Sequence, residues 1–243
     1  MKNIWYICLL ALVIFGCEQK DSFYYEEKAE LYFVSAMGDQ PGNMSKSIDF
    51  AFRRTGQMDM NWMYNLYYGD SLRIDSVTLV VSLLGEVSDK PREYNLEVVT
   101  PDSLPQTQVI LKNPYVLEAN ATRDTIVVVI PRPEKRGEFQ IDLAFVESDD
   151  FTKSSMQNRG KFTLQISDRY PKPAGWEDYI YGEYSEEKYA FWVTVLQAVY
   201  EDKWAFYDMY WMPTTRIDEL IAALNAYNAA HPDAPKDFTF PGM

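Results

Sequence analysis

Asp75-Ser76-Val77-Thr78-Leu79-Val80-Val81-Ser82-Leu83-Leu84 is the stretch that decides the fold class of this 243-residue chain. Within it, Val77, Leu79, Val81 and Leu83 alternate with Ser76, Thr78, Val80 and Ser82. Successive side chains of a strand point to opposite faces, so this period of two predicts a strand with one face against a core. The chain is therefore expected to contain a sheet that is covered on one side.

Strand signals recur on both sides of this stretch. The further predicted strands are Glu30–Ser35, Ser47–Arg53, Tyr94–Val99, Val109–Leu111, Thr125–Ile130, Phe139–Phe145 and Phe162–Ile166. Turn-forming segments rich in Gly and Pro, such as Gly38–Gly42 and Pro131–Pro133, separate them. Seven or eight short strands with regular breaks predict an antiparallel β-sandwich over residues 29–169.

The pattern changes to helical after Tyr170. Ser185 is a predicted N-cap with Glu186 and Glu187 in the first turn, where the helix dipole favours acids. Apolar residues then follow at spacings of three and four. A second helix is predicted to start at Thr215 and to end by Pro232, because proline cannot continue a helix. Residues 170–243 are therefore expected to form a small helical, aromatic-rich region.

The N-terminus carries the pattern of a lipoprotein signal. Lys2 precedes the apolar run Ile4–Phe15, and Gly16-Cys17 follows it. The run is shorter than the ~20 residues of a membrane span, so it indicates a cleaved leader. Ordinary secretory cleavage is the alternative, but it favours a small residue at the position that Ile14 occupies. We expect residues 1–16 to be removed, lipid on Cys17 to be the membrane contact, and residues 17–28 to be a polar tether.

Charge and composition exclude several functions. The formal net charge is −13, which disfavours nucleic-acid binding and electrostatic docking on anionic lipid. The two cysteines are Cys8, inside the predicted leader, and Cys17, so no disulfide framework is expected. His231 is the single histidine and is expected at a solvated helix end. The sequence thus predicts neither a His-based triad nor a zinc site.

Acidic pairs are the remaining source of catalytic or metal chemistry. Glycosidases need two carboxylates across a sugar, roughly 5–10 Å apart, and adjacent acids on one element point to different faces. Glu186-Glu187 is therefore interpreted as helix N-terminal charge. Glu147 with Asp149-Asp150 is a calcium alternative, but a plain acidic loop is the preferred interpretation. No enzyme activity, cofactor or bound metal is predicted.

Two aromatic segments are candidate binding surfaces. The first contains Trp62, Tyr64 and Tyr67, and the second contains Trp204 and Trp211. Exposed rings of this kind stack on sugars or form an apolar patch for a protein partner. The alternative is that the same rings are buried as core or as a covering segment.

Two motifs together resemble a family of uncharacterised lipoproteins from Bacteroidetes-type bacteria. Asp75–Tyr94 resembles its characteristic middle segment, and Gly182–Phe191, with Trp176 before it, resembles its second hallmark. The resemblance covers most of residues 1–200. It implies a sandwich similar to immunoglobulin-like or Calx-β modules, followed by a small helical region. Such proteins are typically encoded beside SusC/SusD-type importers, and the resemblance supplies no catalytic residues.

The sequence therefore predicts a non-catalytic lipoprotein of the outer membrane, facing either the periplasm or the exterior. Its expected role is accessory, in glycan or nutrient uptake, through binding of a polysaccharide or of a SusC/SusD-type importer. An independent surface glycan-binding module is the first alternative. A carboxylate-based hydrolase is the second.

Overall fold

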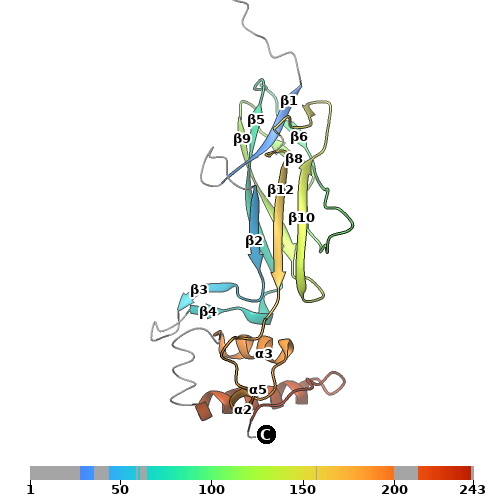
Figure 1. Ribbon diagram of the computed structural model, residues 1–243. Coiled ribbons are helices and arrows are strands. Elements are labelled where there is room, and N and C mark those ends of the chain that lie inside the picture. Colours follow the sequence, from blue (N-terminus) through green and yellow to red (C-terminus); the bar gives the residue numbers. More distant parts are fainter. Residues whose placement is uncertain are drawn as a thin grey trace, which may run out of the picture.

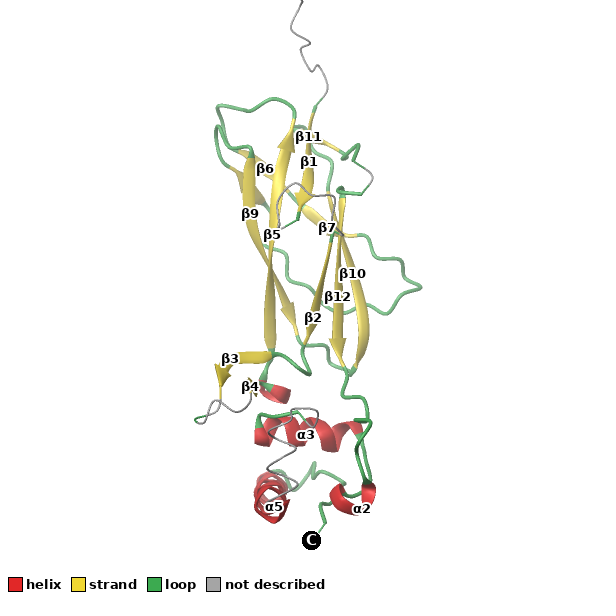
Figure 2. Ribbon diagram, turned by 60° about the vertical axis from the view of Figure 1, so that its left-hand side comes forward, coloured by secondary structure: helices red, strands yellow, loops and turns green. Residues whose placement is uncertain are grey.

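The structure is a computed structural model that describes residues 28–35, 44–58, 60, 65–156, 158–199 and 213–241. A β-sandwich forms the longer part of the body, and a layer of helices lies beyond one end of its strands (Figures 1 and 2). Within the described residues, no helix is long and apolar enough to cross a membrane.

Two four-stranded sheets make the sandwich. The first has the order β11-β1-β5-β9, with β1 at Ala29–Val34, β5 at Ile74–Leu84, β9 at Arg123–Pro131 and β11 at Phe151–Thr152. The second has the order β2-β12-β10-β7, with β2 at Ser45–Asp49, β7 at Leu96–Val98, β10 at Gly137–Phe145 and β12 at Lys161–Asp168. Most pairs are antiparallel, while β1–β11 and β2–β12 are parallel. The predicted sandwich class is confirmed.

The core lies between the sheets and follows the predicted alternation. Val77, Leu79, Val81 and Leu83 of β5 are all buried. From the facing sheet, Leu143 and Leu164 are fully buried. The rings of Phe33 and Phe145 stack across the core with centroids 4.5 Å apart. Burial of such side chains, at roughly 1.5–3 kcal/mol each, drives the two sheets together.

Several predicted strands differ in their bounds, for local reasons. The predicted strand Tyr94–Val99 is split into β6 (Arg92–Tyr94) and β7. The split follows from Asn113, whose side chain accepts the Leu96 N–H at 2.9 Å and donates to the Leu96 carbonyl at 2.7 Å. Ser47–Arg53 ends at Asp49, whose Oδ1 accepts the Phe52 N–H at 3.0 Å and turns the chain. Val109–Leu111 is only a bridge from Ile110 to Val129.

Short strands without an alternating pattern were not predicted. They are β3 (Arg54–Met58), β4 (Asn65–Tyr67), β8 (Tyr115–Leu117) and β11. β3 pairs with β4, and β6 pairs with β8.

The helical layer consists of α2 (Asp178–Tyr181), α3 (Glu186–Leu196) and α5 (Pro213–Ala230). The predicted cap of α3 is confirmed, since Ser185 Oγ accepts the Lys188 N–H at 3.1 Å. α5 begins at Pro213, two residues before the predicted start, because proline suits a first helical position. It ends before Pro232 as predicted.

A second core holds this layer together. Its buried members include Tyr170, Trp176, Tyr189, Trp192, Leu220, Leu224 and Phe240. Lys188 is buried among them, with Nζ 5.0 Å from the centroid of the Phe240 ring, and burial lowers its pKa.

A short 3-10 helix, η1 (Gly69–Ser71), attaches this layer to the strands. Its Asp70 N–H donates to Thr194 Oγ1 of α3 at 2.7 Å. Gly69 has a φ of +55°, and a Cβ there would lie 2.5 Å from Thr194 Oγ1. Only glycine permits this approach.

Candidate functional site

Three rows of polar side chains cross the outer face of the second sheet. The pairing register places them as Ser45–Thr163–Asp142, Ser47–Gln165–Gln140 and Asp49–Ser167–Glu138. Each row runs across β2, β12 and β10, with neighbouring strands roughly 4.8 Å apart. We call these nine residues the polar face. Their neighbours in sequence, such as Ile48, Leu164 and Ile141, are buried in the core, so the polar face points away from it.

Two of the rows border a hollow of about 620 Å³. Its polar lining is Ser47, Asp49, Glu138, Gln140, Gln165 and Ser167, and Leu104 and Pro105 form one wall. We call this the first hollow. The Pro105 carbonyl holds the wall against β10 by accepting the Gln140 N–H at 3.0 Å. The volume is within the range of roughly 300–1,000 Å³ that small-molecule sites occupy.

Hydrogen bonds organise the side chains of the polar face. The Gln140 amide donates to both oxygens of Asp142 at 3.1 Å, and Ser47 Oγ donates to Gln165 Oε1 at 3.4 Å. Asp142 is 1% exposed, and it also accepts from Thr163 Oγ1 at 2.7 Å and Lys161 Nζ at 3.2 Å. Burial favours the neutral acid, but these donors outweigh it and hold the pKa of Asp142 below its ordinary value.

The first hollow is acidic at the end nearest the helical layer. Asp49 and Glu138 lie in one row, and none of the described residues that line the hollow is Lys or Arg. Burial raises the pKa of Asp49, although the backbone N–H groups of Phe52 and Ala51 oppose it. The hollow therefore disfavours phosphate, sulfate and carboxylate ligands.

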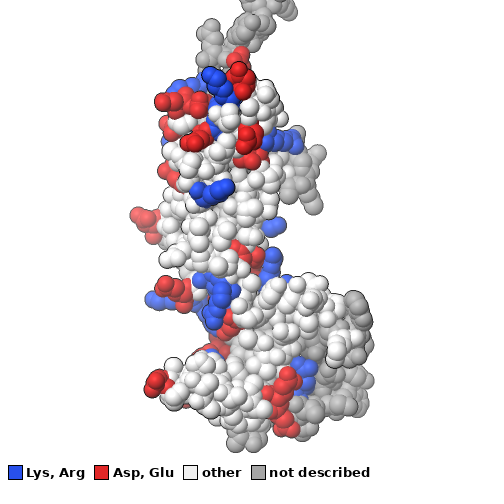
Figure 3. Space-filling model, turned by 180° about the vertical axis from the view of Figure 1, so that it is seen from behind, with Lys and Arg blue, Asp and Glu red and all other residues white. Residues whose placement is uncertain are grey.

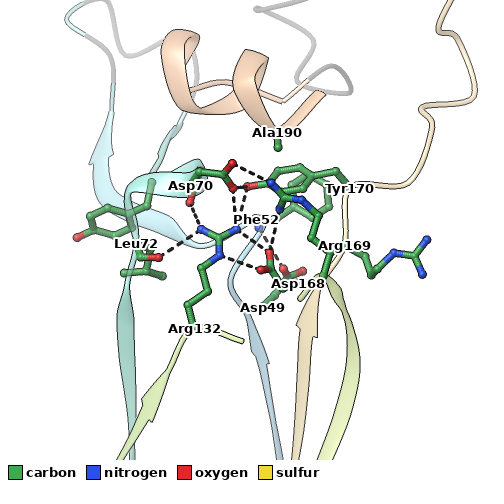
Figure 4. Close-up of polar contacts among 12 residues, drawn as sticks. Asp49, Phe52, Asp70, Leu72, Arg132, Asp168, Arg169, Tyr170 and Ala190 are labelled. Atoms are coloured by element: carbon green, nitrogen blue, oxygen red, sulfur yellow. Dashed lines mark hydrogen bonds and ion pairs between the residues drawn. The ribbon is translucent and has the colours of Figure 1, made fainter. Parts of the chain in front are cut away.

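Directly beyond this row, a charge network joins the sandwich to the helical layer (Figure 4). Arg132 follows β9, and Asp168 ends β12. Arg132 Nε and Nη2 donate to the two oxygens of Asp168 at 2.8 and 2.6 Å. Nη2 also reaches Asp70 Oδ1 at 2.8 Å, and Nη1 donates to the Gly69 carbonyl at 2.8 Å. We call these contacts of Arg132 the ionic joint.

The ionic joint is shielded from water. The Arg132 and Asp168 side chains are 7% and 3% exposed. Arg136 completes it from the side, donating to Asp70 Oδ2 at 2.8 Å with its guanidinium 4.8 Å from the centroid of the Tyr170 ring. Bidentate pairing gives the Arg132 guanidinium and the Asp168 carboxylate each a partner of opposite charge. Buried charges are stable only when they are paired and hydrogen-bonded in this way.

Most sequence-predicted site residues lie outside the described residues. This applies to Cys17, Trp62, Tyr64, Trp204 and Trp211. Tyr67 is described, and it is 6% exposed within the second core. Its N–H donates to the Gln197 carbonyl at 3.0 Å, and Arg54 lies over its ring at 5.9 Å. The Tyr67 ring is therefore not on the surface.

The acidic pairs have structural partners. Glu186 and Glu187 occupy the first turn of α3 as predicted. Glu186 accepts from Arg169 at 2.9 Å, and Glu187 accepts from Lys236 at 2.8 Å. Glu147 Oε1 accepts the Lys153 N–H at 3.3 Å. Among the described residues, no group of three or more His, Cys, Asp or Glu side chains is placed to hold a metal ion.

The opposite sheet has a different surface. Ile74 and Val127, on β5 and β9, are 57% and 51% exposed. Seen from behind, charged side chains gather near the top of the sandwich and around its junction with the helical layer, and much of the surface between them is uncharged (Figure 3). On this sheet the register pairs Ser76 with Val129 and Thr78 with Val127, so these polar side chains stand beside apolar ones.

Sequence reasoning missed the polar face, although part of its signal was present. Ser47 and Asp49 stand on either side of the buried Ile48, and Thr163, Gln165 and Ser167 alternate with buried positions. The apolar half of this alternation is enough to predict a strand, and the polar half adds a signal only when the strands are aligned. Assembling the rows also requires the parallel register of β2 on β12, which no local pattern shows.

Comparisons with known proteins give a family model and distant structural likenesses. The model, described as a domain of unknown function (DUF4843), matches residues 43–198. None of the curated proteins matches significantly. The apo form of the Calx CBD1 domain is 10% identical with a TM-score of 0.36, covering 58% of this chain and 98% of that domain.

Two Bacteroides structures show comparable likeness. EndoBT-3987 of Bacteroides thetaiotamicron, solved with a Man5GlcNAc product, is 12% identical with a TM-score of 0.34, over 57% of this chain and 30% of that protein. A Bacteroides ovatus protein of unknown function is 11% identical with a TM-score of 0.36, over 56% and 46%. This chain spans less than half of each, and nothing about ligand or activity transfers at this level.

The ionic joint predicts a large cost for removing one partner. Arg132→Leu removes the bidentate partner of the buried Asp168 carboxylate and leaves it only the longer contact with Arg136 at 3.4 Å, so it should lower the free energy of unfolding by about 3–5 kcal/mol. Arg53→Leu is the matched control, because the Arg53–Asp75 pair at 3.2 Å has an arginine that is 51% exposed. That change should cost about 0–1 kcal/mol. Urea unfolding measures both, and equal losses would contradict the role given to Arg132.

Asp142 predicts a defined pH dependence. Its folded-state pKa lies below the unfolded value of about 3.9, so its charge stabilises the fold above that pH. The contribution disappears as the pH falls through the lowered folded-state pKa. Asp142→Asn should therefore be less stable at neutral pH and lose less stability on acidification. Urea unfolding at several pH values tests this, and parallel pH profiles for parent and variant would refute it.

Proposed function

We propose that this chain, which belongs to the DUF4843 family, a domain of unknown function, is a non-catalytic, lipid-anchored binding protein of the cell envelope. Because the family has no known function, the ligand is inferred from the geometry of the chain itself. Its polar face holds a polyhydroxylated ligand, and the ligand class is a neutral glycan. The observation that carries this proposal is the pair of polar rows that border the first hollow, Ser47–Gln165–Gln140 and Asp49–Ser167–Glu138.

The chemistry of the rows suits sugar hydroxyls. Carboxamides such as Gln140 and Gln165 both donate and accept, serine hydroxyls do the same, and carboxylates accept only. A hydroxyl needs one partner of each kind, and such partners stand at inter-strand distances across the hollow. Leu104 and Pro105 supply an apolar wall for a C–H face of the ring. The absence of Lys and Arg from the described lining favours an uncharged glycan.

Hydrolysis is the alternative with an observation in its favour, because the first hollow contains two carboxylates. Asp49 and Glu138 are separated by the strand that carries Ser167, roughly 9–10 Å at two strand spacings. Both side chains project from the same face of one sheet, whereas glycosidase acids flank the bond between them. This arrangement supports binding over cleavage.

The accessory role in uptake rests on the family resemblance and on the N-terminal pattern. Lipoproteins of that kind are encoded beside SusC/SusD-type importers, so an importer at the outer membrane is the proposed partner. Affinity purification from native envelopes separates this role from the runner-up: an importer recovered with the lipoprotein supports the accessory role, and recovery alone supports an independent glycan-binding module.

Glycan binding is tested on the polar face itself. In native gels that contain xylan, mannan or β-glucan, we expect at least one polymer to retard the protein. Gln165→Ala should weaken that binding by about tenfold through lost hydrogen bonds. Thr78→Ala, an exposed position on β5 of the opposite sheet, is the control and should bind like the parent.

Three results would contradict the proposal: migration unaffected by every polymer, unchanged binding by Gln165→Ala, or release of new reducing ends. The last result would establish hydrolysis instead of binding. Both positions are exposed, so each substitution should change the free energy of unfolding by less than about 0.5 kcal/mol.

The anchor is tested separately from the ligand. We expect a fatty-acid probe fed to native cells to label the parent protein and to leave Cys17→Ala unlabelled, because the Cys17 thiol is the group to which the lipid is attached. Several acyl chains, at about 0.8 kcal/mol for each buried CH₂, should also keep the parent in the membrane fraction. Equal labelling of parent and variant would refute the anchor.

A further inference from the structure

A second hollow lies next to the first along the same segment of chain. It measures about 350 Å³, and its lining includes Gln106, Thr107, Gln108, Glu134, Lys135 and Phe139. Leu104 and Pro105 wall the first hollow, and the next three residues wall the second. One continuous strip of backbone therefore borders both.

Phe139 contributes to the lining of both hollows. Its half-buried side chain packs against the sandwich core. Gly137 makes room for the ring, since a Cβ at Gly137 would stand 3.0 Å from the Phe139 Cζ atom. The two hollows thus meet at β10 around Phe139, whose ring lies on the core side of the strand, opposite the side chains of Glu138 and Gln140.

The strip is held at both ends by backbone hydrogen bonds. Pro105 is fixed to β10 through the Gln140 N–H, and Ile110 is fixed to β9 by its bond to the Val129 carbonyl at 2.8 Å. The Gln106 amide is occupied by the carbonyls of Thr100 and Pro101, at 3.3 and 3.2 Å. Gln108 is exposed on the strip, so its carboxamide is placed to meet a ligand.

The second hollow matches the first in favouring an uncharged ligand. Arg132 also borders it, but its guanidinium is engaged by Asp70 and Asp168 in the ionic joint. Glu134 and Lys135 contribute opposite charges. The remaining chemistry is carboxamide, hydroxyl and aromatic.

We propose that the two hollows are successive subsites for one linear, neutral glycan chain that passes β10 at the position of Phe139. The ligand class is therefore an extended polymer and not a mono- or disaccharide. This inference rests on the proposed glycan binding and deepens it. The first hollow is the larger, so the shortest bound oligomers occupy it alone, and longer ones gain contacts with Gln108.

The test uses oligosaccharide ladders of the xylo, manno and cello series, from disaccharide to octasaccharide, with affinity measured by calorimetry. We expect affinity to rise with length and then level off once both hollows are filled. Gln108→Ala should weaken octasaccharide binding by about tenfold and leave disaccharide binding unchanged. Gln165→Ala should weaken both. Unfolding midpoints of the two variants verify that each retains the fold.

The outcomes separate the two proposals. If Gln165→Ala weakens binding but affinity is independent of length, or Gln108→Ala has no effect or weakens all lengths equally, the ligand has one subsite and this inference fails alone. If no ladder binds, or Gln165→Ala binds like the parent, the proposed function fails with it.

Discussion

The bidentate pair between Arg132 and Asp168 is the contact on which the arrangement of this molecule depends. It ties the ends of β9 and β12, which belong to different sheets, and it reaches η1 through Asp70 and the Gly69 carbonyl. Since η1 is bonded to α3 through Thr194, one guanidinium positions the helical layer against the sandwich. Buried charges of this kind tolerate only the geometry that satisfies them, so the joint fixes one orientation rather than merely adding affinity between the parts.

The same strand register that builds the core also builds the polar face. Ile48, Leu164 and Ile141 point inward, and the residues between them align on the outside in rows. A register slip of one residue would bury polar groups and expose the core. Burial of the apolar side chains therefore fixes the strand register, and the register fixes which polar side chains stand side by side. Asp49 ends one row beside Asp168 and Arg132, so the polar face is supported by the core beneath it and by the ionic joint at one end.

Local patterns in the sequence were enough to predict the class of fold. The alternation around Val77–Leu83 gave the central strand, and Ser185 with its two following acids gave the start of α3, because both signals arise from neighbouring residues. The polar face and the joint could not be found in this way. Ser47 and Gln165 are 118 positions apart, and Arg132 and Asp168 are 36 apart. The hydrogen bond that ends β2 at Asp49 is local, but an Asp followed by two apolar residues does not by itself predict the end of a strand. Tyr67 is a predicted binding residue that is buried in the structure, because aromatic content alone does not distinguish a ligand-binding ring from a ring in a core.

The most direct measurement of the central claim is an amide chemical-shift titration of the protein with an oligosaccharide from the ladders that binds it. The account predicts shifts concentrated on β2, β12, β10 and residues 104–108, with β5 and β9 unaffected at their exposed faces. Shifts confined to the helical layer, to residues 61–64 or to residues 200–212, with the polar face silent, would contradict it.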